Sequence, residues 1–219
     1  MNQVWFVFRD CPSSFTLVLD LAINLKLAAM LALEHEDQTI YDKKVLHKLD
    51  FAKFESIFNP PISVSKPGEG LVIRPLQSSD FNLGYINLLA QLTCTGDISR
   101  KEFTDRFQSM VRCPNTYYIT VVEDVTTCQI VGSASLVLEQ KFIHKCALRG
   151  RVEDVVVSDQ YRGKQLGKLL MATMVLLAEH LGVYKLTLDC RDHMVPFYQT
   201  FGYDKEPGNS NYMQIRFKS

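Results

Sequence analysis

One stretch of the sequence, residues 151–181, constrains the fold more than any other. A β-branched run at 152–157 leads through a turn rich in glycine and cations into an apolar-periodic segment at 164–181. This pattern predicts a strand, a turn and a long helix. A helix start carries backbone N–H groups without internal partners and the positive end of the macrodipole. Because Gly163 and Gly167 leave that backbone open to a ligand, the turn is typical of an anion-binding site.

The overall charge makes this anion site a local feature. Lysine plus arginine number 24, and aspartate plus glutamate also number 24. A net charge of zero gives no general attraction to nucleic acid, so we expect no nucleic-acid partner. The positive charge of Arg162, Lys164 and Lys168 therefore belongs to the turn. An ordinary strand-to-helix turn with surface lysines would have the same composition, so the flanking residues must separate the two interpretations.

The cysteine pattern indicates reduced thiols. The six cysteines show no Cys-x-x-Cys spacing and lie at positions 11, 94, 113, 128, 146 and 190. Such usage favours an intracellular, cytoplasmic protein. Cys190 and His193 are too sparse a pair for a metal centre, and we expect no metal.

Residues 1–38 predict a helical extension of unknown role. The run at 15–33 is rich in leucine, alanine and valine, but Asp20 and Lys26 interrupt it. No charge-free run approaches the roughly 20 residues that a spanning helix needs, so we expect no transmembrane segment. Arg9 is cancelled by Asp10, which argues against a signal peptide. An appendage, a helix laid on the core and a membrane-surface anchor all fit this composition.

The rest of the chain predicts an α+β domain. Residues 39–70 form a segment that ends in a linker rich in proline and glycine, and residues 71–219 form the domain itself. We expect strands at 71–74, 117–123, 130–138, 152–157, 184–190 and 212–217. We expect helices from Ser79 or Asp80 to about Gln91, after Asp97 or Ser99, at 164–181 and at 196–201. The order predicts a central mixed β-sheet flanked by helices.

Several blocks of this domain together resemble one enzyme family. They lie at 74–76, 91–93, 141–144, 151–158, 162–167, 184–185, 189–190, 197–198 and 213–216. From about Tyr41 to Phe217 the chain is similar to the glucosamine 6-phosphate N-acetyltransferases of the GNAT superfamily. The resemblance implies the GNAT acyl-CoA N-acyltransferase fold and transfer of acetyl from acetyl-CoA to the 2-amine of glucosamine 6-phosphate. It also implies direct attack in a ternary complex, a place in UDP-N-acetylglucosamine biosynthesis, and a homodimer with shared active sites.

The resemblance assigns acetyl-CoA to the strand and the turn. Two central parallel strands splay apart in this superfamily, so that backbone groups of the strand can pair with pantetheine. The implied cofactor contacts are Val155, Val156, Val157, Arg162, Gly163, Lys164, Gln165, Leu166, Gly167, Lys168, Asp189 and Tyr198. The turn departs from the family pattern Gln/Arg-x-x-Gly-x-Gly/Ala at Gln165, where glycine is usual. Met194 stands where relatives commonly carry an asparagine that contacts the cofactor.

The resemblance also implies the residues that perform the chemistry. Tyr198 would donate a proton to the leaving thiolate, since a phenol with an ordinary pKa of about 10 is protonated at neutral pH. Asp189 would orient the amine, and Glu153 is a weaker candidate for proton removal. Neighbouring strand residues point to opposite faces, so at most one of Glu153 and Asp154 is expected to hold the sugar by its side chain.

A sugar phosphate requires cations of its own, and the resemblance places Lys185 and Arg216 at the phosphate. The implied acceptor contacts are Thr93, Lys141, Phe142, Ile143, His144, Glu153, Asp154, Val155, Tyr184, Lys185 and Arg216. Arg216 lies in the last predicted strand and is expected to serve the site of a partner subunit.

Two other functions remain open on sequence grounds. A GNAT enzyme acting on peptide or polyamine amines would favour an acidic or open groove, against which Lys141, Lys185 and Arg216 argue. A catalytically silent acyl-CoA-binding module would have no use for Asp189 and Tyr198.

Overall fold

A five-stranded mixed sheet forms the centre of the computed structural model, which describes residues 37–208 and 213–215. The strands lie in the order of their numbering: β1 (Leu71–Pro75), β2 (Tyr117–Asp124), β3 (Gln129–Gln140), β4 (Leu148–Val157) and β5 (Val183–Thr187). Neighbours from β1 to β4 are antiparallel, and β4 and β5 are parallel. The predicted α+β class with a mixed sheet is confirmed.

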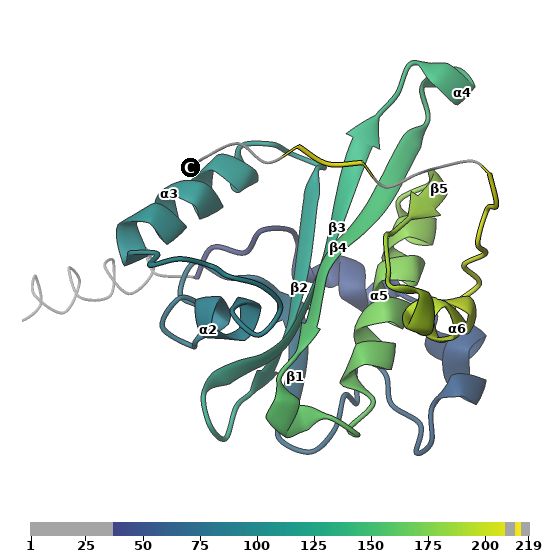
Figure 1. The fold of residues 1–219 in the computed structure, drawn as a ribbon. Helices are drawn as coiled ribbons and strands as arrows, with labels where there is room; N and C mark the ends of the chain where they lie inside the picture. Colours follow the sequence, from purple (N-terminus) through teal and green to yellow (C-terminus); the bar gives the residue numbers. More distant parts are fainter. Residues whose placement is uncertain (1–36, 209–212, 216–219) are drawn as a thin grey trace, which may run out of the picture. The chain divides into compact units, whose positions relative to one another are not determined.

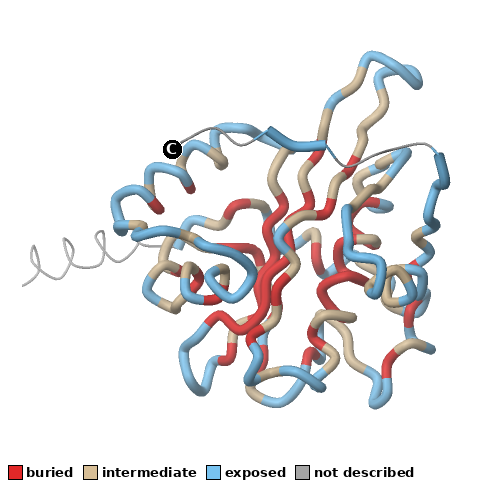
Figure 2. Tube along the Cα trace, in the orientation of Figure 1, coloured by how far each residue is buried: buried red, intermediate tan, exposed pale blue. Residues whose placement is uncertain are grey.

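Helices cover both faces of the sheet (Figure 1). On one face lies α5 (Leu166–His180), whose side chains Leu169, Leu170 and Leu177 are 0% exposed. On the other face α2 (Tyr85–Leu89) and α3 (Arg100–Val111) enclose a second apolar cluster. Figure 2 shows the buried residues concentrated along the sheet and the elements that pack on it. The apolar periodicity at 164–181 thus correctly predicts a helix packed on the sheet.

The compact unit begins at Thr39 rather than at Leu71. The 3₁₀ helices η1 (Lys43–Lys48) and η2 (Phe51–Ile57) bring Leu46 and Phe54 into the same core as α5. Residues 39–70 therefore form part of the domain, although they hold little regular structure after Ile57. The predicted helical extension falls almost entirely on residues 1–36, outside the described residues. Among the described helices, none has the length and apolar character to cross a membrane.

The predicted helix at 79–91 is shorter than expected. It begins at Tyr85, with Gly84 in the N-cap position, because the Asp80 carboxylate binds elsewhere instead of capping a helix. The second capping prediction is confirmed, since Ser99 and Glu102 form a capping box at the start of α3. β5 ends at Thr187, three residues before the predicted end.

The last predicted strand, 212–217, lies mostly outside the described residues. Its described part, residues 213–215, forms no strand. Met213 and Ile215 are 88% and 80% exposed, so in the described residues no neighbouring element covers these apolar side chains.

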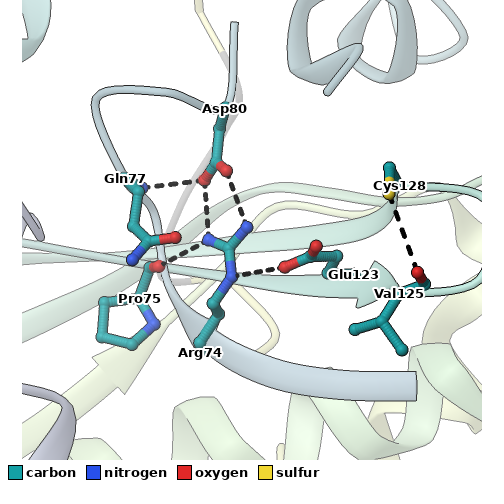
Figure 3. A network of polar contacts seen from close by, with 7 residues as sticks. All are labelled: Arg74, Pro75, Gln77, Asp80, Glu123, Val125 and Cys128. Atoms are coloured by element: carbon teal, nitrogen blue, oxygen red, sulfur yellow. Dashed lines mark hydrogen bonds and ion pairs between the residues drawn. The ribbon is translucent and has the colours of Figure 1, made fainter. Parts of the chain in front are cut away.

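The Asp80 carboxylate, which does not cap a helix, forms a buried ion pair with the Arg74 guanidinium (Figure 3). Arg74 Nη1 and Nη2 donate to the two Asp80 carboxylate oxygens at 2.9 and 2.7 Å, and the Gln77 amide donates to the same carboxylate at 2.8 Å. Arg74 Nε donates to Glu123 on β2 at 2.8 Å. The side chains of Asp80 and Arg74 are 0% and 13% exposed. The network therefore joins β1, β2 and the loop before α2 in a region that water hardly reaches.

Asp80→Asn is expected to lower the free energy of unfolding by about 3 kcal/mol, because it leaves the buried Arg74 charge partly uncompensated. Urea denaturation followed by circular dichroism measures this change. The matched control is Asp105→Asn, which breaks the exposed Lys101–Asp105 pair on α3 and should leave the midpoint unchanged. Equal effects of the two variants would contradict a structural role for the buried pair.

Candidate active site

β4 and β5 separate within the sheet. Their pairing runs from Leu148↔Val183 to Arg151↔Thr187 and stops where β5 ends. β4 continues to Val157, paired with β3 on its other side. Over this stretch the described part of the chain places no strand on the β5 side of β4. An extended, amide-bearing ligand can pair with backbone that is left open in this way.

The turn before α5 presents backbone donors. Gln165 occupies the N-cap position in a left-handed conformation, with φ 60° and no side-chain cap. The first helical bond runs from the Leu169 amide to the Gln165 carbonyl at 3.0 Å. The amides of Leu166, Gly167 and Lys168 have no partner in the part of the chain that the structure describes. Gly163 has φ +82°, a conformation that favours glycine. The turn therefore has the geometry of an anion site.

Each cation of the turn has a contact in the described residues, two of them within three positions along the chain. Arg162 pairs with Asp159, and both side chains are largely exposed. Lys164 Nζ lies 4.5 Å from the centre of the Tyr161 ring. Lys168 Nζ donates to the Ile57 carbonyl at 2.8 Å. Lys164 and Lys168 thus keep their charges without an acidic partner in the described residues, whereas Arg162 is paired with Asp159.

Arg151 holds together two of the predicted catalytic residues. Its Nε donates to Glu153 and its Nη2 donates to Asp189, which lies beyond the end of β5. We did not predict a role for Arg151. The alternation of Arg149, Arg151 and Glu153 along β4 was the available signal, because residues two apart lie on one face of a strand.

Tyr198 lies on the short helix α6 (Val195–Gln199), half-buried against Phe197 and Tyr203. Burial raises the pKa of its phenol, and Cys190 adds a smaller effect in the same direction. The phenol therefore holds its proton at neutral pH. Tyr198, Glu153, Asp189 and Lys185 line one cavity of about 1550 Å³. The structure thus brings all three predicted catalytic residues to the same cavity.

Glu153 and Asp154 do not follow simple strand alternation. A bulge shifts the register of β3 and β4 between Ser133 and Ser135, and Asp154 has φ 50°. As a result both acids line a second cavity of about 780 Å³, which extends toward α2 and α3. Only Glu153 lines the main cavity as well, so the expectation that at most one of the two acids holds the sugar by its side chain stays a prediction. Burial raises the pKa of Asp154, and the charge of Glu153 raises it further.

The predicted acceptor contacts are only partly assembled in the single chain. Lys141, Phe142, Ile143 and His144 lie at the tip between β3 and β4, near the short helix α4 (Ile143–Cys146), which projects beyond the sheet (Figure 1). Phe142 is 97% exposed. Thr93 follows α2, and neither Thr93 nor the four tip residues line either cavity. The His144 ring lies 4.5 Å from that of Tyr184.

Arg216 is outside the described residues. In the described chain no group of three histidine, cysteine or acidic side chains is placed to hold a metal ion.

Comparison with known proteins places this arrangement in a family. Residues 85–203 match the acetyltransferase (GNAT) family. A Drosophila melanogaster protein named "Probable glucosamine 6-phosphate N-acetyltransferase" is 50% identical over 183 residues, 83% of each chain. The Arabidopsis thaliana glucosamine 6-phosphate N-acetyltransferase is 38% identical over 134 residues, 61% of this chain and 90% of that one.

The fold agrees with the sequence comparison. The crystal structure of the Arabidopsis enzyme superposes with a TM-score of 0.65 at 36% identity, covering 68% of this chain and 100% of that one. The resemblance found in the sequence is therefore confirmed, and the chain belongs to the GNAT family of acetyltransferases.

Proposed function

We propose that this chain transfers the acetyl group of acetyl-CoA to the 2-amine of D-glucosamine 6-phosphate, giving N-acetyl-D-glucosamine 6-phosphate and CoA. The observation that carries the proposal is the cavity where β4 and β5 separate, lined by Glu153, Asp189 and Tyr198. The names of the relatives at 50% and 38% identity support the substrate. The reaction would supply UDP-N-acetylglucosamine synthesis in the cytoplasm.

Acetyl-CoA would lie along β4 and the turn before α5. The backbone of Val155, Val156 and Val157 would pair with pantetheine on the side that β5 leaves open. The unpartnered amides from Leu166 to Lys168 would receive the pyrophosphate, which is attracted by the helix N-terminus and nearby cations. This placement brings the thioester toward the cavity that holds Tyr198.

Acetyl transfer requires a group that orients the amine, a group that accepts the amine proton and an acid that protonates the leaving thiolate. The neutral amine attacks the thioester carbonyl, and the C–S bond breaks as the thiolate leaves. Tyr198 would give the thiolate its proton, since its phenol is protonated at neutral pH. Asp189 would orient the amine, and Glu153 would accept the proton that the amine loses. Both substrates are bound together, so no acyl-enzyme forms.

The sugar site would be completed by a second copy of the chain. Lys185 lines the main cavity, but the tip residues Lys141 to His144 do not. Phe142, Met213 and Ile215 are 97%, 88% and 80% exposed, which is unfavourable for apolar side chains in a monomer. A homodimer in which the tip and Arg216 reach the partner's cavity would bury these groups and assemble the acceptor site.

Glucosamine 6-phosphate is expected to be acetylated at least about 100-fold more efficiently than glucosamine, because a phosphate bonded to a cation contributes roughly 1.5–3 kcal/mol per contact. Thiol release measured with each sugar gives kcat/KM. Equal values would contradict a phosphate site. Efficient acetylation of spermidine or a peptide would favour the alternative GNAT activity.

Lys185→Met is expected to raise the KM for glucosamine 6-phosphate about tenfold and to leave that for glucosamine unchanged. The matched control is Lys205→Met, which removes another cation from the same cavity. Equal increases for both variants would indicate general charge attraction instead of a phosphate contact at Lys185.

Tyr198→Phe is expected to lower kcat roughly 100-fold, since it removes the acid that protonates the thiolate. The dissociation constant for CoA, measured by calorimetry, should change little. Because burial raises the pKa of the folded-state phenol, the wild-type Tyr198 stays protonated through neutral pH. The control Tyr203→Phe removes a neighbouring hydroxyl that has no partner in the described residues. Unchanged turnover in Tyr198→Phe would exclude the acid role.

Arg151→Lys tests the positioning of the two carboxylates. Lysine keeps the charge but lacks the planar fork that reaches Glu153 and Asp189 together, so kcat is expected to fall about tenfold. Binding of CoA should be retained. Arg112→Lys, on an exposed residue that bonds within its own helix, serves as the control. A normal kcat in Arg151→Lys would show that the bridge is dispensable.

A further inference from the structure

We propose that Gln165 is a positioning residue for cofactor binding: its side chain clasps residues 57–60 and thereby holds the turn before α5 in its anion-binding conformation. The inference rests on the proposed acetyl-CoA site at this turn. It gives a physical reason for glutamine at a position where the GNAT pattern usually has glycine.

The backbone of Gln165 shows why glycine is usual there. Its φ and ψ are 60° and 13°, in the left-handed region. This conformation costs free energy for a residue that has a Cβ, and glycine avoids that cost. A glutamine that adopts it needs a compensating interaction.

The side chain supplies that interaction. Its Oε1 accepts from the Asn59 amide at 2.9 Å, and its Nε2 donates to the Pro60 carbonyl at 3.0 Å. Both partners are backbone groups of one short segment that precedes the turn by more than 100 residues. Glycine at position 165 could form neither bond.

Lys168 makes a second attachment to the same segment. Its Nζ donates to the Ile57 carbonyl at 2.8 Å. Residues three apart lie on one side of a helix, so Gln165 and Lys168 contact the segment together. We name residues 57–60 with these two side chains the N-terminal clasp.

The clasp is attached to a rigid support. Phe54 and Phe58, which flank its start, are 6% and 5% exposed in the main core. The Phe54 ring lies 5.9 Å from that of Phe201, close to α6. Because these side chains fix residues 57–60 to the core, the segment can restrict the turn instead of moving with it.

The clasp is expected to increase the affinity of the turn for its anion. The amides of Leu166, Gly167 and Lys168 can bind one anion only while the turn keeps its present shape. Without the clasp, only a fraction of the molecules would have the turn in this shape. The apparent dissociation constant for CoA would then rise by the inverse of that fraction. By reciprocity, a ligand that binds the clasped turn must stabilise the contact with Asn59.

Two variants of the full-length protein test the clasp. Gln165→Gly removes the side chain and relieves the backbone. Gln165→Asn keeps a polar amide and tolerates the left-handed conformation, but it is one methylene too short to keep both bonds. The matched control is Lys53→Met, which breaks another contact between η2 and α5, the Lys53–Glu179 pair near the far end of the helix.

We expect both Gln165 variants to raise the dissociation constant of CoA about five- to tenfold, as the loss of two hydrogen bonds allows. At saturating acetyl-CoA their kcat should stay within about twofold of wild type, since the residue acts on binding and not on chemistry. Lys53→Met should bind CoA as wild type does. The measurements are isothermal titration calorimetry and steady-state kinetics.

Hydrogen exchange at the Asn59 amide provides a readout that does not depend on activity. CoA should slow this exchange in wild type and in Lys53→Met, and should have no such effect in either Gln165 variant. CoA affinity within about twofold of wild type in Gln165→Asn, or an undiminished CoA effect on Asn59, would overturn the proposal. Weakening in Gln165→Gly alone would also overturn it, because backbone freedom would then be the cause.

The proposed cofactor site and the clasp can fail separately. A wild-type chain that bound no CoA would overturn the cofactor site, and the clasp's role with it. Normal CoA binding in wild type and in both Gln165 variants would overturn the clasp alone.

Discussion

The separation of β4 from β5 determines where this protein can perform chemistry. Parallel pairing ends at Arg151↔Thr187, and β4 continues alone toward Val157 on that side. Elsewhere in a sheet, backbone N–H and C=O groups bond to the neighbouring strand. At this opening a ligand can take the place of that strand. The fully buried leucines of α5 fix the helix against the sheet, and the helix begins nine residues after β4 ends at Val157. In the proposed function, the open backbone of β4 and the amides at the start of α5 would thus bind the same cofactor.

The parts of this arrangement that depend on local pattern could be predicted from the sequence. Strand, turn and helix at 152–181 follow from periodicity and glycine placement, and the Ser99 cap follows from a short motif. The length of β5 could not, because the alternation of leucine with polar residues continues to Asp189 after the pairing has stopped. Alternation of apolar and polar residues shows which side chains share a face of an extended segment. The end of the strand depends on backbone hydrogen bonds to a neighbouring strand, which the alternation does not show.

Other features depend on partners that are distant in sequence. Asp80 is a good helix cap by type, but the buried Arg74 binds it more strongly than a helix amide would. The bulge near Asp154 is a shift in the pairing of β3 with β4. It depends on both strands together, so the sequence of β4 alone does not predict it. Arg151 likewise gains its role only when the chain brings Asp189 next to Glu153. Sequence analysis therefore named three candidate catalytic residues that line one cavity but missed the residue that joins two of them.

The ion pairs in the main cavity limit what a single chain offers to a sugar phosphate. Arg151 is already shared between two carboxylates, and Lys185 lies 3.4 Å from Glu206. A phosphate dianion entering such a cavity would compete with these acids for Arg151 and Lys185, whereas Arg149, which lines the same cavity, pairs with no acidic side chain in the described residues. A further guanidinium without an acidic neighbour would change that balance, because it could bind the phosphate with two parallel hydrogen bonds. The proposed contribution of Arg216 from a second copy would add another guanidinium, so in this scheme dimerisation strengthens phosphate recognition.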